Sequence, residues 1–271
     1  MAENSSACIR YQARQLARFY AAHRRSWAEF YPSEHEAFAR AAGPDNDLGL
    51  VLDAGCGAGG LGLALGERFG LRGYVGVDIH AGAVAAGQAA GGFACPARLI
   101  AGDILAVSDL EPASFDTVTS LSCADWNLET TAILAACWRY VRPGGRFILT
   151  LRLSPLPTLM DMGTSYQYLS FEDAPPEDCA GLERAPYVVL NTGHALSLLA
   201  GLSPAPASIF AYGYWGAPSP TAVLPYDRLA FTALTVTKPE AGTEIAATRA
   251  ELHLPADAFF APGEIPGGGG N

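Results

Sequence analysis

Short apolar runs alternate with helical patterns through the middle of the chain. The predicted strands are residues 49–53, 74–78, 98–103, 115–121 and 146–151, and the predicted helices between them are residues 60–69, 81–90 and 128–140. Continuous apolar strands that alternate with helices are typical of a parallel sheet with helices on both faces. We therefore predict an α/β fold, built as a doubly wound, three-layer α/β/α arrangement.

The flanking segments have a different texture. Residues 7–42 show helical spacing interrupted at Pro32, and Ser33 with Glu36 resembles a capping box that opens a second helix. Residues 154–186 contain prolines, acids and aromatic residues without a clear period, which indicates a lid-like insertion. The later predicted elements are a helix at 191–200 capped by Asn191 or Thr192, strands at 208–215 and 229–237, and a helix at 244–252.

The length of 271 residues suits one α/β domain with additions, or a domain with a small second unit. We expect an N-terminal helical cap at 1–44 and a core domain at 45–240 that contains the insertion. A C-terminal extension follows at 241–271, and its glycine-rich end is expected to be disordered.

Glycines follow the first predicted strand of the core. The run Leu50-Val51-Leu52-Asp53-Ala54-Gly55-Cys56-Gly57-Ala58-Gly59-Gly60 predicts a buried strand, a tight turn and a helix N-terminus. The free N–H groups at such a helix start attract an anionic or polar ligand group, which indicates a nucleotide-type cofactor. The glycine spacing fits a dinucleotide pattern as well as other cofactors, so the glycines alone leave the cofactor open.

Three consecutive strands end in an aspartate. Asp53 stands directly before the glycines, where its charge would repel a pyrophosphate and suits a cofactor with a cation and an amine nearby, either directly or by ordering the turn. Asp78 can accept hydrogen bonds from ribose hydroxyls, which suits NAD equally. Asp103 can accept one from an adenine amine. Because ligands of parallel sheets lie outside the carboxyl ends of the strands, the three acids indicate one crevice.

Composition narrows the classes of function. The formal net charge of −10 disfavours a nucleic-acid partner. No apolar run is long enough for a membrane span, and the N-terminus lacks the apolar core of a signal peptide, so we expect a cytoplasmic protein without a membrane partner. The six cysteines are scattered without a CxxC pair, which suggests neither a zinc site nor a disulfide framework. Small-molecule chemistry is the default, and the sequence leaves the oligomeric state open.

Taken as an ordered set, the motifs resemble those of the class I S-adenosylmethionine (SAM) dependent methyltransferases. The matching stretches are residues 51–59, 75–79, 101–104, 115–118 and 141–146. The resemblance covers roughly residues 48–152. It implies a Rossmann-like, seven-stranded, mostly parallel sheet whose seventh strand, here 228–238, runs antiparallel between strands five and six. It also implies SAM as the cofactor and S-adenosylhomocysteine as its product.

The resemblance also implies the cofactor contacts. Gly55 and Gly57 would approach the methionine part, Asp78 would hold the ribose, and Asp103 would bind the adenine amine. Ile79 would pack on the adenine, with Ile104 beside Asp103. The remaining expected cofactor contacts are Asp53 near the cation and amine, Ser120, Leu121 and Ser122 on the sulfonium side, and Tyr11 and Tyr20 in the N-terminal cap. The alternative for Asp78 and Asp103 is a carboxylate that only orders a turn, and Asp116, far from the crevice, is expected to be structural.

Methyl transfer is an in-line displacement, so the protein mainly holds the reactants in line and excludes water. An oxygen or nitrogen nucleophile can also need a base. Asp125 is our first candidate for a base or substrate anchor, with N-capping of the next helix as the alternative. His194 is the second candidate, with a structural role as the alternative. The expected substrate contacts are Trp126, Asn127, Tyr166 and Tyr168. No acid follows the fifth strand at 150–154, so no metal is expected.

The predicted function is SAM-dependent methyl transfer to a small or medium-sized acceptor, with oxygen or nitrogen favoured over carbon. Three alternatives remain: a non-catalytic SAM-binding scaffold, a protein methyltransferase, and an NAD-dependent oxidoreductase. The last lacks an evident Tyr-x-x-x-Lys pair, and Lys238 is the single lysine of the chain.

Overall fold

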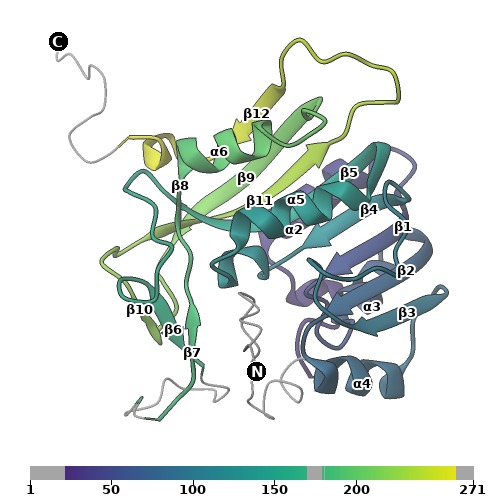
Figure 1. Ribbon diagram of the computed structural model, residues 1–271, viewed down its shortest axis with the longest axis horizontal. Coiled ribbons are helices and arrows are strands. Elements are labelled where there is room, and N and C mark those ends of the chain that lie inside the picture. The colour runs from purple at the N-terminus through teal and green to yellow at the C-terminus, as the bar shows by residue number, and fades with distance from the viewer. Residues whose placement is uncertain (1–21, 170–178, 180, 261–271) are drawn as a thin grey trace, which may run out of the picture.

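A nine-stranded mixed sheet runs through the part of the molecule that is described, which in this computed structural model comprises residues 22–169, 179 and 181–260 (Figure 1). Along the sheet lie β12 (Arg249–His253), β9 (Ser208–Gly216), β11 (Leu229–Thr237), β5 (Val141–Ser154), β4 (Phe115–Ser120), β1 (Asp47–Ala54), β2 (Gly70–Asp78) and β3 (Ala97–Ala101), and β8 (Leu190–Asn191) pairs with β5 off this path. The five predicted core strands are therefore present.

The direction of the strands confirms the predicted topology. Neighbours among β1 to β5 pair in parallel, whereas β11 pairs antiparallel with both β5 and β9. The late strand that ends at Thr237 therefore runs antiparallel between the fifth and sixth strands of the core sheet, as the resemblance implied.

The predicted helix at 244–252 is wrong, because this segment supplies β12. Its residues pair in parallel with β9, from Arg249 opposite Ser208 to His253 opposite Tyr212. The edge of β9 presents unpaired N–H and C=O groups, and filling them outweighs a weak local preference for helix. The C-terminal extension thus contributes to the main sheet, and the end expected to be disordered, 261–271, lies outside the described residues.

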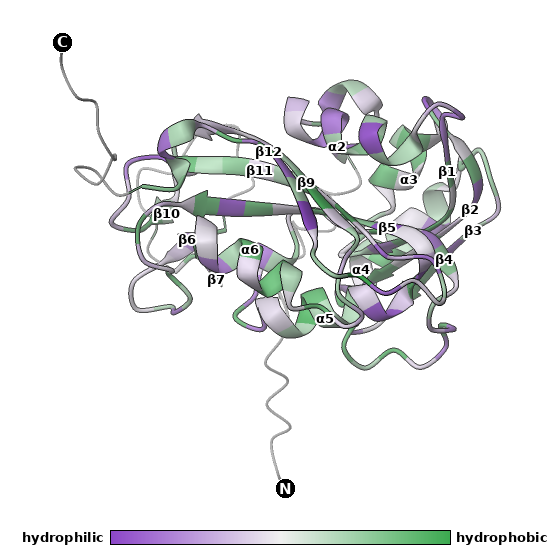
Figure 2. Cartoon of the chain, turned by 90° about the horizontal axis from the view of Figure 1, so that it is seen from above, coloured by the Kyte–Doolittle hydropathy of each residue, from purple (hydrophilic) through white to green (hydrophobic). Residues whose placement is uncertain are grey.

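Helices cover both faces of the sheet (Figure 2). The helical elements are η1 (Trp27–Glu29), α2 (Pro32–Ala42), α3 (Gly60–Gly66), α4 (Ala81–Ala90), η2 (Ala124–Trp126), α5 (Thr130–Tyr140), α6 (Thr192–Ala200) and η3 (Ala256–Ala258). Apolar residues of α2, α3 and α4 share one buried cluster with one face of the sheet, and those of α5 and α6 share a second cluster with the other. Trp138 and Phe147 are fully buried in the second cluster. This arrangement confirms the three-layer α/β/α prediction.

Helix α2 begins at Pro32 with Tyr31 as its N-cap, so the capping box pairs Tyr31 with Glu34, and the prediction of Ser33 with Glu36 is wrong by two residues. The Glu34 carboxylate accepts hydrogen bonds from the Tyr31 N–H, at 2.8 Å, and from Arg24, at 2.6 Å. The side chain that caps α6 is Asn191, which accepts the His194 N–H at 3.2 Å as one of the two predicted caps. Among the described helices, none is long and apolar enough to cross a membrane.

The predicted insertion contains strands that its sequence did not reveal. β6 (Tyr166–Tyr168) and β7 (Arg184–Pro186) form a three-stranded sheet with β10 (Ala222–Val223), which comes from much later in the chain. The local pattern could not show this sheet, because β6 pairs with β10, Tyr166 opposite Val223, across more than fifty positions, and with β7 across the segment between Tyr168 and Arg184. The domain boundaries at residues 44 and 240 remain predictions.

Candidate active site

The glycine turn has the backbone conformation that its sequence predicts. Gly55, Gly57 and Gly59 have φ angles of 83°, 54° and 79°, in the left-handed region that favours glycine, and α3 begins at Gly60. The Gly55 N–H donates to the carbonyl oxygen of Val77 at 2.8 Å, which ties the turn to β2. The turn therefore stands at the carboxyl end of β1, and the N–H groups of Gly55, Gly57 and Gly59 already have acceptors within the protein.

Neighbouring segments approach the turn closely. A Cβ added at Gly55 would lie 2.6 Å from the Cys123 sulfur, and one added at Gly60 would lie 2.4 Å from the Arg24 carbonyl oxygen. The segment after β4 and the segment before η1 therefore both pack against the turn where only glycine fits.

Asp53 lies inside the sheet, 3% exposed. Its carboxylate accepts hydrogen bonds from the Tyr74 hydroxyl at 2.6 Å and the Thr119 hydroxyl at 2.7 Å, which join β1 to β2 and β4. Burial raises the pKa of Asp53 to about 6, and the two hydroxyl donors partly oppose this rise. Both oxygens are thus used within the sheet, which agrees with the expectation that Asp53 orders the turn, whereas a direct cofactor contact remains a prediction.

Asp78 connects the end of β2 to the turn. Its two carboxylate oxygens accept the Gly57 N–H at 2.8 Å and the His80 N–H at 2.7 Å. Burial raises the pKa of Asp78, and the two backbone donors act in the opposite direction. The predicted ribose ligand therefore stands next to the glycine turn, followed by Ile79, and it also orders that turn.

Asp103 shows the turn-ordering contact that was its alternative role. Its carboxylate accepts the Leu105 N–H at 2.9 Å, and the Asp103 carbonyl oxygen accepts the N–H groups of Ala106 and Val107. Ile104 is buried beside it. Their predicted adenine contacts are not tested by these observations.

The end of β4 carries an unusual backbone conformation. Ser122 has a φ of 46°, which is uncommon for a residue other than glycine and is often found at functional sites. Its N–H donates to the Thr150 hydroxyl at 2.7 Å. Ser120 and Leu121 are buried, and the Ser120 hydroxyl has no hydrogen-bond partner among the described residues.

Asp125 forms an ion pair with Arg152, which was not among the predicted site residues. The Arg152 Nε lies 2.7 Å from an Asp125 carboxylate oxygen, and Arg152 Nη2 lies 2.5 Å from the Asp125 carbonyl oxygen. The guanidinium carbon of Arg152 lies 3.6 Å from the ring centre of Tyr187 and 5.1 Å from that of Trp126. The second oxygen of Asp125 and the Nη1 atom of Arg152 are buried without a partner among the described residues.

The alternative role of Asp125, N-capping of α5, is not the one the structure shows. Helix α5 begins at Thr130, and the Asn127 side chain accepts the Glu129 N–H at 3.3 Å while the Asp125 carboxylate binds Arg152. Arg152 gave one signal in the sequence, a lone charge within an apolar strand. Its partner is 27 residues away, so the sequence did not show which group it would neutralise.

The other predicted site residues are spread over α6, the small sheet and the surroundings of the Asp125–Arg152 pair, and two of them lie outside the described residues. His194 is exposed in α6, and its Nδ1 lies 3.1 Å from the Thr158 hydroxyl. Tyr166 and Tyr168 lie in β6 of the small sheet, with ring centres 5.4 Å apart. Tyr11 and Tyr20 lie outside the described residues. Trp126 and Tyr187, with ring centres 6.2 Å apart, lie close to the Asp125–Arg152 pair.

Comparison with known proteins agrees with this geometry. Residues 51–145 match the model of a methyltransferase domain. A ubiquinone biosynthesis O-methyltransferase of Pseudomonas putida is 31% identical over 159 residues, which are 54% of this chain and 66% of that protein. The protein of the same name from Pseudomonas paraeruginosa is 31% identical over 152 residues, 52% of this chain and 64% of its own length. The match therefore spans slightly less than two thirds of these relatives.

Solved structures show the same fold. A SAM-dependent methyltransferase from Methanosarcina mazei has a TM-score of 0.55 at 15% identity, over 78% of this chain and 99% of that one. A putative methyltransferase from Listeria monocytogenes has a TM-score of 0.50 at 17% identity, over 77% and 99%. The strand order of the sheet and the glycine turn are those of a Rossmann-like methyltransferase fold. Residues 51–145 therefore form a methyltransferase domain, and the fold is that of SAM-dependent methyltransferases, in agreement with the resemblance.

Proposed function

We propose that the protein is an enzyme that transfers a methyl group from SAM to an oxygen of a small or medium-sized acceptor and releases S-adenosylhomocysteine. The observation that carries this proposal is the Asp78 carboxylate bound to the Gly57 N–H at the carboxyl end of β2, within the methyltransferase domain. SAM supplies an electrophilic methyl group on a positively charged sulfur.

The charge beneath the turn favours SAM over NAD. With a pKa of about 6, the Asp53 carboxylate is mostly ionised at pH 7. A negative charge inside the sheet attracts a cationic sulfonium and ammonium and repels a pyrophosphate, and burial strengthens both effects. The negative charge of Asp53 beneath the turn therefore favours SAM over a dinucleotide as the cofactor.

The Asp125–Arg152 pair acts as an anchor for the acceptor in this proposal. Asp125 is neutralised by Arg152, so it is a poor general base, and we assign it the second of its two predicted roles. The unpartnered Asp125 oxygen and Arg152 Nη1 offer one hydrogen-bond acceptor and one donor. Trp126 and Tyr187 add aromatic surface beside them. These groups suit a hydroxylated, planar acceptor, and the O-methyltransferase relatives support oxygen as the nucleophile.

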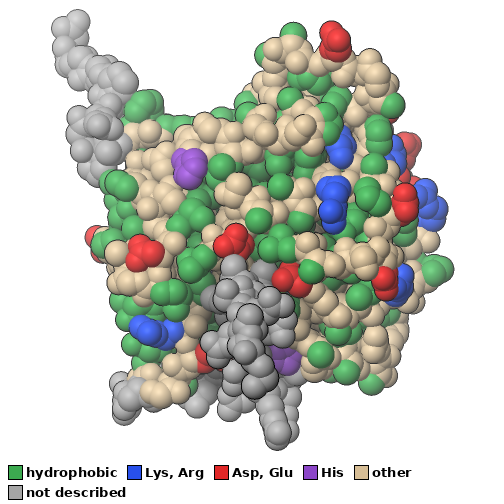
Figure 3. Space-filling view, viewed as in Figure 1, with side chains coloured by type: hydrophobic (Ala, Val, Ile, Leu, Met, Phe, Trp, Pro, Cys, Tyr) green, Lys and Arg blue, Asp and Glu red, His purple; other side chains and the backbone are tan. Residues whose placement is uncertain are grey.

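A cytoplasmic location and the absence of a nucleic-acid partner belong to the same proposal. The net charge of −10 supports the absence of a nucleic-acid partner, because such a partner ordinarily needs a basic face. On the face shown in Figure 3, the described Lys and Arg side chains lie among acidic and apolar ones rather than in one large patch.

Thermal unfolding with added ligands tests the cofactor. S-adenosylhomocysteine at about 100 times its Kd should stabilise the protein by roughly 2.7 kcal/mol, whereas NADH should leave the melting temperature unchanged. Asp78→Asn removes the charge that holds the turn and the ribose, so it should weaken binding at least tenfold. Asp109→Asn is the matched control, because Asp109 is an exposed acid paired with Arg98 at 3.5 Å. Stabilisation by NADH alone would contradict the proposal.

Mass spectrometry of acceptors incubated with SAM separates the remaining alternatives. Methylation of small hydroxylated aromatic compounds supports the proposal. Ligand-dependent stabilisation with no methylated product would favour the non-catalytic scaffold, and methylation of peptides alone would favour a protein methyltransferase.

A further inference from the structure

A small pocket lined by arginines lies at the edge of the sheet opposite the glycine turn. Arg40 comes from α2, Arg146 from β5 and Arg249 from β12. Strands β1, β5, β9 and β12 run in the same direction, and the pocket lies near the start of β9 and β12, whereas the glycine turn follows the end of β1. The pocket is therefore separate from the cofactor crevice.

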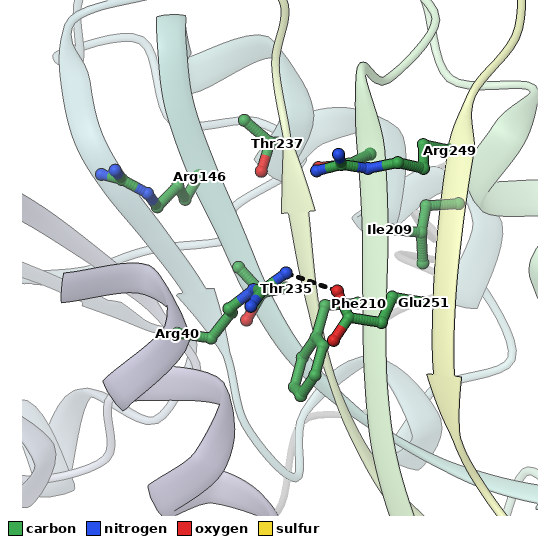
Figure 4. Close-up of a pocket in the computed structure, with 9 residues that line it drawn as sticks. Arg40, Arg146, Ile209, Phe210, Thr235, Thr237, Arg249 and Glu251 are labelled. Atoms are coloured by element: carbon green, nitrogen blue, oxygen red, sulfur yellow. Dashed lines mark hydrogen bonds and ion pairs between the residues drawn. The ribbon is translucent and has the colours of Figure 1, made fainter. Parts of the chain in front are cut away.

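The arginines surround a strand end that carries hydroxyl groups. Figure 4 shows Thr237, the last residue of β11, between Arg146 and Arg249: the guanidinium of Arg249 points toward Thr237, that of Arg146 points away from it in this view, and Arg40 approaches from α2. Ser208 and Thr237 line the pocket, and their hydroxyls form no hydrogen bond with the described residues. The third hydroxyl, that of Thr235, donates to the Ala37 carbonyl oxygen at 2.9 Å. Two hydroxyls are thus available to a ligand.

The charges of the lining do not cancel. Glu251 is its single carboxylate, and it pairs with Arg40 at 2.5 Å. Among the described residues, no carboxylate forms an ion pair with Arg146 or Arg249. Three guanidinium groups and one carboxylate leave a net charge of +2 in a chain whose formal net charge is −10. An unbalanced positive cluster of this kind attracts an anion.

The size and the donors select the anion. The cavity holds about 50 Å³, several times the roughly 10–15 Å³ that a single water requires. We propose that it binds a phosphate group, either as free phosphate or as part of a small phosphate monoester. A phosphate carries a charge close to −2 at pH 7 and accepts paired N–H donors from arginine and O–H donors from hydroxyls. A monoanionic carboxylate would leave part of the positive charge uncompensated.

An open groove continues from the pocket and has room for the organic part of a monoester. Phe210, Tyr212 and His253 line it, and it shares Arg40 and Glu251 with the pocket. Its volume is about 450 Å³. The aromatic walls can contact a planar group attached to the phosphate.

Titration calorimetry with inorganic phosphate and with phenyl phosphate, at low ionic strength, tests the site. Phosphate should bind saturably, and Arg249→Gln and Arg146→Gln should each raise its Kd, by about tenfold for Arg249, because each removes a positive charge from the lining. Arg98→Gln is the matched control: it removes the same charge from an exposed pair outside the pocket and should leave the Kd within twofold. Tighter binding of phenyl phosphate would identify a monoester as the ligand, and equal binding would identify free phosphate.

Three results would overturn the proposal. The first is the absence of saturable binding of either probe to the full chain, and the second is an equal loss of affinity in all three variants. The third is competition by S-adenosylhomocysteine, which would place the phosphate in the cofactor crevice. An unchanged phosphate Kd in its presence is expected, and this outcome does not depend on the proposed methyl transfer.

Discussion

Replacing Arg152 with methionine tests how far the Asp125–Arg152 pair depends on burial. The exposed fractions of the two side chains are 6% for Asp125 and 4% for Arg152. Methionine keeps an apolar stem of similar length but removes the guanidinium, so the Asp125 carboxylate stays buried without a counter-charge. Breaking a buried pair in this way costs about 3–5 kcal/mol. The loss is a large fraction of a typical unfolding free energy of about 5–15 kcal/mol.

Urea unfolding at pH 7, followed by circular dichroism, measures this loss. The control Arg98→Met breaks an exposed pair with a separation of 3.5 Å, which should cost about 0–1 kcal/mol. The double variant Asp125→Leu with Arg152→Met replaces both charges with apolar groups and should regain most of the lost stability. Its acceptor KM should nevertheless rise while S-adenosylhomocysteine binding is unchanged, because the anchor is lost and the cofactor turn is intact.

The reasoning is refuted if Arg152→Met costs less than about 1 kcal/mol, as the control does. That result would mean that water screens the Asp125 carboxylate, and the argument that burial makes this pair depend on both charges would fail.

Three further predictions concern Asp53 beneath the turn, the glycine at the start of α3 and the cap of α6. Because burial raises the pKa of Asp53 to about 6, above its unfolded value of about 3.9, the folded state binds this proton more tightly. Stability should therefore fall by up to about 3 kcal/mol as the pH rises from about 4 to about 6, and Asp53→Asn should abolish this part of the dependence in urea unfolding across that range. Gly60→Ala should cost about 1–3 kcal/mol, because the new Cβ meets a backbone oxygen, whereas Gly102→Ala, with open space around it, should show no such clash in the same assay. Asn191→Ala should cost about 1 kcal/mol in thermal unfolding through loss of the α6 cap, and no loss would mean that the cap is redundant.

The core of the fold could be predicted because its signals are local. Apolar strands, an alanine-rich helix at 81–90 and the cap at Asn191 each depend on residues within a few positions of one another. The glycine turn belongs to the same group, since a positive φ at Gly55 or Gly57 is a property of single residues.

The partners of the site residues could not be predicted in the same way. Asp125 was selected by its place after the fourth strand, but its role changed once Arg152 was found beside it. Asp53 was expected near the cofactor, and the Tyr74 and Thr119 hydroxyls that hold it come from neighbouring strands of the sheet. Strand β12 and the small sheet of β6, β7 and β10 formed in segments predicted as a helix and as an irregular insertion.

The sequence by itself determined the α/β class, the positions of the central strands along the chain, the glycine turn and the three acids at the strand ends. Tertiary structure alone decided which charges are neutralised, which edges of the sheet are extended, and where Arg40, Arg146 and Arg249 meet. The physical reason is distance along the chain. Periodicity and turn chemistry act over a few residues, whereas an ion pair such as Arg40 with Glu251 joins residues 211 positions apart and exists only after the sheet has formed.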